Sequence, residues 1–397
     1  MLIYWIWLSQ LSGVSHSQKL ELLQAFRDPE EIYKADSNAI CAVKMLPEKA
    51  LQSLQKRDLQ EARRILTDCA QKNISILTYG DAAYPVRLKN IHQPPFVLYY
   101  KGCLPDWESV PVIGIVGTRK ASGYGLRAAR QLGAQIASCG ALVASGGADG
   151  IDTMALEGAL AAQKKVVAVL GFGADVVYPA RNRDLFQRIE RQGCLLTEFA
   201  PGTPPNAWNF PQRNRIISGL SSGILVVEAP ERSGALNTAR HAIEQGRDVY
   251  VVPGNVDSIS SAGSNQLLRE GAMPVLSGWD VVSQYESLYP GFVCKEETAA
   301  AEACFRNEPI LPRPAYQADN KSIDNPDKSR YSVEDNRNHN LTAEEKAVLS
   351  LLSQQPVPAD QIIADAGLPT GKVLSVLTML AMKGLVQNHP GKYLSLK

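Results

Sequence analysis

The spacing of apolar side chains divides the chain into four segments, and the first spans residues 1–78. Apolar residues recur at helical spacing through this segment, which predicts short helices over residues 2–11, 17–26, 29–35 and 47–69. We therefore expect a small all-α domain of the helix-hairpin-helix or SAM-like kind.

The turn at residues 11–17 is the feature of this segment that suggests a ligand. It resembles the turn of a helix-hairpin-helix unit, in which flanking glycines let backbone N–H groups approach a DNA phosphate. Ser15, however, stands where the second glycine is expected. A simple turn in a helical bundle is the favoured alternative.

The pattern changes over residues 79–288, where short apolar runs alternate with glycine-rich turns and helical segments. Strands that are apolar on both faces and alternate with helices are typical of a parallel sheet covered by helices on both sides. We predict a Rossmann-like, doubly wound α/β domain, with a further apolar run at residues 96–100 pairing at its edge. Its strands are expected at residues 112–116, 141–144, 166–170, 194–197, 224–227 and 249–252.

The last two segments are a polar stretch and a second small domain. Residues 289–340 are rich in Asn, Asp, Pro, Lys and Glu and lack apolar periodicity, which predicts a flexible linker. Residues 341–397 predict a winged helix. The first helix is expected to begin at a capping box over residues 342–345. The second and third helices are expected at residues 359–366 and 370–383, and the two strands of a hairpin at residues 385–388 and 393–396.

Composition narrows the function classes. Hydrophobic residues make up 45% of the 397 residues and charged residues 20%, which is enough apolar material for several buried cores. The net charge of +1 means that any basic surface has to be local. The seven Cys form no CxxC pair, and no apolar run is long enough to span a membrane. We expect a cytoplasmic protein without a metal site, a disulfide framework or a membrane segment.

Candidate chemistry lies in the turns of the central segment, because ligands of a parallel sheet bind at the carboxyl ends of its strands. Several of these turns combine glycines, which let backbone approach an anion, with arginines that pair with phosphate. Successive anion-binding turns suit a polyanion, and Tyr178, Trp208 and Phe210 could stack bases. The turns are residues 117–120 with Arg119, 145–152, 171–183 with Arg181, 209–217 with Arg213 and Arg215, and 228–238 with Arg232.

Three other interpretations stay open. Glycine turns can simply close βα units. A dinucleotide site is disfavoured, because the GxGxxA string at residues 123–128 lies past the first turn and the next strand ends at Ser145 instead of an acidic residue. A nucleotide-hydrolysing enzyme similar to the lysine-decarboxylase-like family is disfavoured because residues 231–240 lack the glutamate that follows the threonine of that family's motif.

Acidic residues in the same turns offer acid–base chemistry. The best candidates are Asp149, Asp152 and Glu228. For Asp149 and Asp152 we favour structural roles in a turn and in the first turn of a helix, where a carboxylate interacts well with the helix dipole.

Taken together, the motifs of the central segment resemble those of the DNA processing protein A (DprA/Smf) family. The order of the flanking segments, helical before and winged helix after, agrees with that resemblance. The motifs that carry it are residues 117–119, 145–152, 178–179, 210–217, 228–229, 232–236 and 252–254.

The resemblance implies a function and a set of DNA-binding positions. It implies a non-enzymatic homodimer without a cofactor that binds single-stranded DNA, protects incoming DNA and helps load a RecA-type recombinase in natural transformation. Arg181 is included because Ala180 stands where many relatives have a basic residue. The implied positions are Gly117, Thr118, Arg119, Gly146, Gly147, Gly150, Arg181, Arg213, Asn214, Arg215, Ser233 and Gly234.

The C-terminal segment gives a weaker indication of DNA binding. Residues 341–397 carry five Lys and Arg against four Asp and Glu, whereas a duplex-binding winged helix is normally more basic. We favour a protein contact or a weak DNA contact for this domain. A winged helix that acts as the effector, with the central domain as its scaffold, is the alternative.

Overall fold

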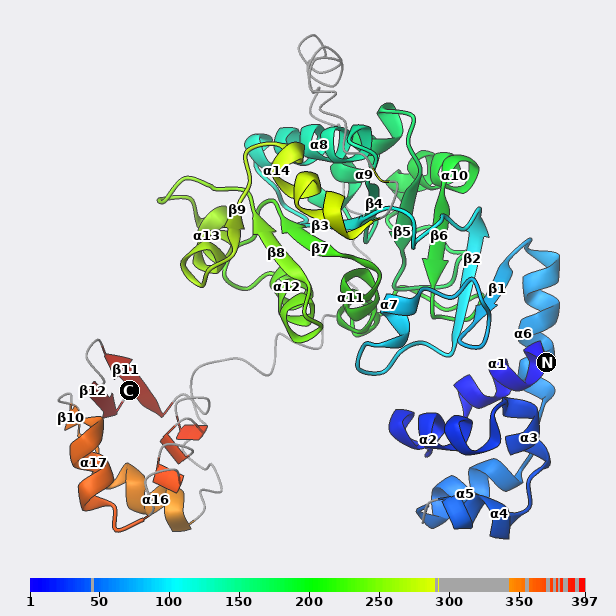
Figure 1. Ribbon diagram of the computed structural model, residues 1–397, viewed down its shortest axis with the longest axis horizontal. Helices are drawn as coiled ribbons and strands as arrows, with labels where there is room; N and C mark the ends of the chain where they lie inside the picture. The colour runs from blue at the N-terminus through cyan, green and yellow to red at the C-terminus, as the bar shows by residue number, and fades with distance from the viewer. Residues whose placement is uncertain are drawn as a thin grey trace. The chain divides into compact units, whose positions relative to one another are not determined.

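The chain folds into two compact units, Met1–Tyr316 and Gln317–Lys397. The structure, a computed structural model, is shown in Figure 1. It describes residues 1–43, 46–289, 292, 343–353, 357–368, 372–373, 376–377, 379–380, 385–389 and 393–396.

Among the described residues, six helices precede the sheet, where the apolar spacing predicts four. The predicted single helix over residues 47–69 is wrong: the chain breaks between α5 and α6, where Arg57 has a φ of +45°. Helix α4 was not predicted. The helices are α1 (Leu2–Gln10), α2 (His16–Phe26), α3 (Pro29–Lys34), α4 (Ser37–Val43), α5 (Glu48–Gln55) and α6 (Gln60–Gln71).

The turn between α1 and α2 is closed by a side chain. Ser15 caps α2: its hydroxyl accepts from the Gln18 N–H at 3.3 Å, and the Gln18 side chain accepts from the Ser15 N–H at 2.7 Å. Two of the amides at this helix start, those of Ser15 and Gln18, are therefore occupied. This favours the simple-turn interpretation over a DNA-binding turn.

The central sheet has nine strands in the order β1-β2-β6-β5-β4-β3-β7-β8-β9. All neighbours from β6 to β9 are parallel, whereas β2 pairs antiparallel with both β6 and β1. The doubly wound α/β fold is confirmed. The strands are β1 (Ser75–Thr78), β2 (Val97–Gly102), β3 (Val112–Val116), β4 (Leu142–Ser145), β5 (Val166–Val169), β6 (Cys194–Thr197), β7 (Gly223–Val226), β8 (Asp248–Val251) and β9 (Met273–Pro274).

Two predictions at this end of the sheet are wrong. The run at residues 96–100 becomes β2, which is not an edge strand because β1 lies outside it. Strand β1 itself falls within the segment predicted to be all helical. The core of the N-terminal helices includes Phe96, Val97 and Tyr99, so these helices pack directly on the sheet.

Helices cover both faces of the sheet (Figure 1). In β3, Ile113 and Ile115 pack with residues of α8 and α9, whereas Val112 and Val116 pack with residues of α11 and α12. This alternation produces two buried layers. The helices are α7 (Val86–Lys89), α8 (Gly123–Ser138), α9 (Ile151–Ala161), α10 (Arg183–Gln192), α11 (Asn209–Leu220), α12 (Gly234–Glu244), α13 (Ala262–Arg269) and α14 (Gly278–Val282), with 3₁₀ turns η1 (Ala180–Asn182), η2 (Ile259–Ser261) and η3 (Ser283–Leu288).

The C-terminal unit has its own small core. The described residues between 372 and 380 are helical, and Val373, Val376, Leu377 and Leu380 among them are buried. The predicted hairpin is confirmed by the pairing of β11 with β12. The elements are α16 (Ala343–Leu349), α17 (Ala359–Asp365), β10 (Val357–Pro358), β11 (Val386–His389) and β12 (Tyr393–Leu396).

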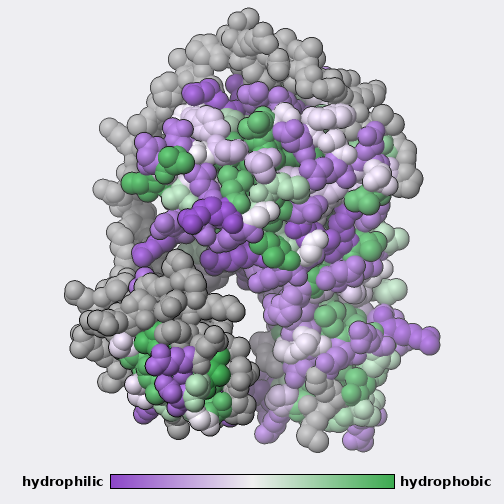
Figure 2. Space-filling model, turned by 60° about the vertical axis from the view of Figure 1, so that its left-hand side comes forward, coloured by the Kyte–Doolittle hydropathy of each residue, from purple (hydrophilic) through white to green (hydrophobic). Residues whose placement is uncertain are grey.

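Some predictions lie outside the described residues. Of the predicted linker, residues 289–340, only Tyr289 and Phe292 are described, and parts of the predicted helix at residues 370–383 are not. Within the described ranges, no helix has the length and apolar character needed to cross a membrane. Hydrophilic and hydrophobic residues are intermixed over the face drawn in Figure 2.

Candidate functional site

The turns singled out from the sequence meet at one edge of the sheet. Strands β3 to β8 run parallel, so their carboxyl ends share that edge, as predicted. A pocket opens there above β3, β4 and β5. Its lining residues are Arg119, Gly146, Gly147, Ala148, Asp149, Phe172, Tyr178, Pro179 and Phe210.

Two of the predicted glycines hold the loops of the pocket together. A β-carbon on Gly117 would overlap Ile151, and one on Gly150 would overlap the carbonyl oxygens of Thr118 and Arg119. Gly150 also has a φ of +79°, which favours glycine. These glycines therefore permit the loops after β3 and β4 to touch, and the contact fixes the backbone that carries Arg119.

The turn after β4 offers free backbone donors. The N–H of Gly146 donates to Asp152 Oδ2 at 3.1 Å, and Gly147 has a φ of +65°. The N–H groups of Gly147 and Asp149 donate to no other residue in the described part of the chain. Both residues line the pocket, so both amides are available to an anion there.

An aromatic wall faces this turn. The ring centroids of Phe172 and Tyr178 lie 6.0 Å apart, and those of Tyr178 and Phe210 lie 5.9 Å apart. The guanidinium carbon of Arg119 lies 4.7 Å from the centroid of Phe210. Arg119 forms no ion pair with a carboxylate within the described ranges, although its charge opposes the rise in the pKa of Asp152. The pocket therefore combines a cation, free amides and aromatic rings.

Phe172 is the pocket residue that sequence reasoning missed. It lies between Gly171 and Gly173 directly after β5, in a turn considered only for its glycines. The signal was present, because a large apolar residue between two turn glycines at a strand end has to pack somewhere near that edge. It is 2% exposed and forms the inner end of the aromatic wall.

Arg181 forms an ion pair at the pocket. Its Nε donates to Asp149 Oδ1 at 2.5 Å and its Nη2 to Asp149 Oδ2. The hydrogen bonds that Arg181 donates to Asp149 raise the pKa of Arg181. The sequence led us to expect that Arg181 contacts a phosphate. In the structure its positive charge is instead compensated by Asp149.

Arg213 lies beneath the pocket instead of lining it, which corrects the sequence-based expectation. It is 4% exposed, and its Nη1 donates to the carbonyl oxygens of Gly146, at 2.6 Å, and of Val169. Burial lowers its pKa to about 10. Arg213 thus joins the carboxyl ends of β4 and β5 from below.

Arg215 and Asn214 do not line the pocket. The sequence interpretation took residues 209–217 as a turn before a helix, but α11 already begins at Asn209, and neighbouring residues of a helix project about 100° apart. Arg215 Nη2 pairs with Glu198 Oε2 at 2.5 Å, both side chains being 11% exposed. Asn214 Nδ2 donates to the Gly234 carbonyl at 3.2 Å.

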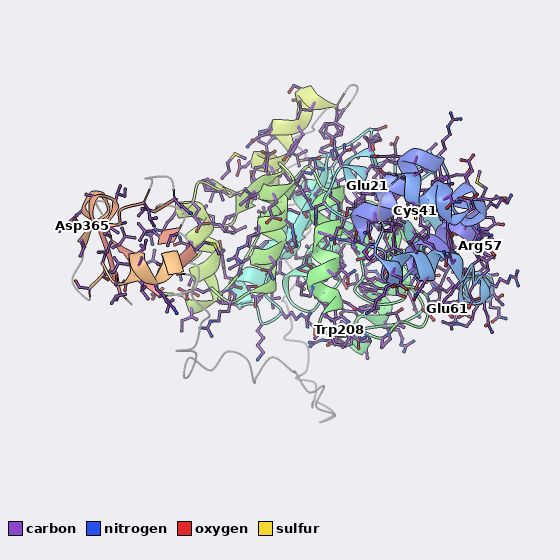
Figure 3. All side chains as sticks on the ribbon, turned by 90° about the horizontal axis from the view of Figure 1, so that it is seen from below. Glu21, Cys41, Arg57, Glu61, Trp208 and Asp365 are labelled. Carbon is purple, nitrogen blue, oxygen red and sulfur yellow. The ribbon has the colours of Figure 1, made fainter. Side chains whose placement is uncertain are left out.

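Three further residues singled out from the sequence lie outside the pocket lining. Ser233 caps α12, its hydroxyl accepting from the Ala235 N–H at 3.3 Å, and a β-carbon on Gly234 would meet open space. Trp208 is 68% exposed at the start of α11, and Figure 3 places it at the surface.

The three acid–base candidates are all engaged. Asp149 pairs with Arg181, as described above, and Asp152 accepts from the Gly146 amide. Burial raises the pKa of Asp152 to about 6, against the opposing effect of nearby Arg213. Glu228 is 1% exposed and does not line the pocket. Asp149 and Asp152 thus each have a partner within the protein.

Two family models match the chain. A model described as DNA recombination-mediator protein A matches residues 75–286, which include the sheet and every pocket residue. A model described as the DprA winged helix domain matches residues 334–392.

Individual relatives extend this similarity. The chain is 34% identical to protein Smf of Synechocystis sp., over 98% of this chain and 97% of the relative. It resembles the X-ray structure of DNA processing protein A from Streptococcus pneumoniae with a TM-score of 0.63 and 32% identity, over 72% of this chain and 98% of the other. A structure of DNA processing protein A from Helicobacter pylori, described for its single-stranded DNA binding mode, has a TM-score of 0.50 and 27% identity, over 54% and 97% of the two chains.

Proposed function

The chain belongs to the DNA recombination-mediator protein A (DprA/Smf) family, and from this premise we propose that it binds single-stranded DNA in the pocket at the carboxyl edge of its central sheet. One nucleotide occupies the pocket. Its phosphate is bound by Arg119 and by the backbone amides of Gly147 and Asp149, and its base lies near Tyr178 and Phe210.

One observation carries the proposal: Arg119 lies over the ring of Phe210 without a carboxylate partner in the described part of the chain. A free guanidinium beside aromatic rings combines a phosphate contact with a surface for base stacking. The bases of a duplex are already stacked and paired. The arrangement therefore favours an unpaired strand.

The other predicted positions have supporting roles in this proposal. Gly117, Thr118 and Gly150 fix the loop that carries Arg119, and Gly146 with Arg213 forms the floor. Arg181 contacts a second phosphate, which displaces Asp149 from the guanidinium group. Ser233 and Gly234 contact the strand further along the same edge, with Asn214 and Arg215 shaping helix α11 behind it.

Family membership supports further parts of the proposal. We propose that the protein acts in the cytoplasm as a homodimer, protects incoming DNA and helps load a RecA-type recombinase during natural transformation. In this role it binds DNA without a cofactor and without catalysing a reaction on it.

Arg119→Ala tests the phosphate contact. Loss of one phosphate contact reduces the slope of log affinity against log salt by about 0.7, which corresponds to about fivefold weaker binding at 0.1 M salt. The measurement is fluorescence anisotropy with a labelled oligonucleotide over a series of salt concentrations. Lys120→Ala is the matched control, because Lys120 is an exposed cation in the same loop outside the pocket lining. Equal effects of the two variants would remove the pocket from the proposal.

Phe210→Leu tests base stacking. Leucine keeps apolar packing but has no aromatic face, so affinity should fall about tenfold with an unchanged salt slope. Trp208→Leu is the control, because Trp208 is an exposed aromatic residue two positions earlier and outside the pocket lining. A loss confined to Trp208→Leu would place the bases on the surface of α11 instead of in the pocket.

A further inference from the structure

A second place on the same edge has the geometry of a phosphate site. Strands β3 and β7 are neighbours, and the chain leaves β3 toward one side of the sheet and returns at β7 to build the other (Figure 1). Open α/β sheets bind ligands at such a switch point. Helix α8 begins there, with Ser122 as its N-cap.

The first turn of α8 also carries glycines at the spacing of a dinucleotide-binding motif, Gly123 and Gly125. In that motif the second glycine lets the backbone approach a pyrophosphate closely. A β-carbon on Gly125 would overlap Glu228 Oε2. The space that this glycine leaves is therefore used by a carboxylate of the protein itself.

Glu228 is held in this place by both of its oxygens. The Ser122 N–H donates to Oε2 at 2.8 Å, and the Ser260 hydroxyl donates to Oε1. The side chain comes from the end of β7 and is 1% exposed. It thus reaches from one strand of the switch point to the helix that follows the other.

The charge of Glu228 has no cationic partner. No Lys or Arg forms an ion pair with it in the described ranges, although a buried carboxylate is costly without compensation. What compensates it is an amide of the N-cap and the positive end of α8, a helix of 16 residues. The same two features compensate a bound phosphate in other α/β proteins.

We propose that Glu228 is a specificity-determining residue that substitutes for a ligand phosphate at the start of α8 and closes this position to nucleotide diphosphate groups. Removing the carboxylate opens a site for a pyrophosphate group between β3 and β7. This inference does not depend on DNA binding in the pocket above β4 and β5, because it concerns a different helix and different amides.

The test is binding of inorganic pyrophosphate to the full chain, measured by isothermal titration calorimetry. Glu228→Ala should bind pyrophosphate about tenfold more tightly than the wild type, because the amide and the helix dipole are freed. Glu228→Gln keeps the volume of the side chain and should show no gain. Adding Gly125→Ala to Glu228→Ala should abolish the gain, because the new methyl group enters the same space.

Two outcomes overturn the proposal. One is a folded Glu228→Ala variant that binds pyrophosphate no better than the wild type, and the other is a gain that persists in the double variant. If Glu228→Ala does not fold alone, the variant is refolded with and without pyrophosphate. Folding only in the presence of pyrophosphate supports the proposal, and failure to fold under both conditions overturns it.

Discussion

The two sides of strand β3 use the same elements for opposite purposes. On the β4 side, a glycine turn leads into α9 beneath an open pocket, and its carboxylate, Asp152, lies buried under the floor. On the β7 side, α8 has two glycines in its first turn, and the carboxylate of Glu228, from the end of β7, fills the space at this helix start. One side is available to an anion and the other is already occupied by one.

This difference shows what a glycine-rich turn can and cannot indicate. The turn and the following helix create a place where negative charge is stabilised. Whether that charge belongs to a ligand or to the protein depends on a side chain from a distant part of the sequence. We call the β4 side of β3 the open side and the β7 side the closed side. Variants can therefore separate residues that stabilise the structure of the open side from residues that bind DNA there.

The largest expected effect comes from the floor of the open side. Arg213→Ala leaves the carbonyl oxygens of Gly146 and Val169 without their buried donor. We expect the free energy of unfolding to fall by about 3 kcal/mol, because each unsatisfied buried group costs 1–3 kcal/mol. Urea denaturation followed by circular dichroism measures this change.

Arg119→Ala is the control for that experiment. Arg119 is exposed, so its removal should change the free energy of unfolding by less than about 0.5 kcal/mol while weakening DNA binding. If Arg213→Ala instead kept full stability and lost only DNA affinity, Arg213 would belong to the binding surface and not to the floor.

The fold was largely predictable because its signals are local. Six apolar runs predicted the central strands to within one residue at every end, and their alternation with helices predicted the doubly wound sheet. Strands β1 and β2 were misjudged because their pairing depends on tertiary contacts with the N-terminal helices. The break between α5 and α6 depends on one residue with positive φ, Arg57, which apolar spacing does not reveal.

The candidate site was predictable only in part. Of the residues predicted from the sequence, Arg119, Gly146 and Gly147 line the pocket. It could not show that Arg213 is buried whereas Arg119 is exposed. The burial of Arg213 depends on the direction in which its side chain leaves α11, which the sequence does not reveal. It also could not show that Arg181 is paired with Asp149, since the two residues come from different turns.

The second prediction concerns the pH dependence of the open side. The pKa of Asp152 is raised from 3.8 to about 6 in the folded protein, so the folded state holds this proton more tightly than the unfolded state. The resulting stabilisation is fully present below pH 4 and is lost as the pH rises through 6. Relative to the wild type, Asp152→Asn should therefore be about 2 kcal/mol more stable at pH 7 than at pH 4.

Asparagine is a suitable substitution because it keeps an acceptor for the Gly146 amide and cannot ionise. The measurement is urea denaturation of both proteins between pH 4 and 7.5. Asp149→Asn is the control, because no buried carboxyl is removed there. A constant difference between Asp152→Asn and the wild type over this range would mean that Asp152 ionises as easily in the folded state as in the unfolded state.

The smallest expected effect comes from the ion pair at the pocket, and it is a gain. Asp149→Asn removes the carboxylate that pairs with Arg181, so the guanidinium becomes free for a phosphate. We expect the salt slope for oligonucleotide binding to increase by up to about 0.7 and the affinity at 0.1 M salt to rise up to about fivefold. Adding Arg181→Ala should cancel the gain, because the cation that produces it is then absent. If Asp149→Asn weakened binding instead, Asp149 would contribute to the site directly, and the open side of β3 would use its carboxylate as the closed side does.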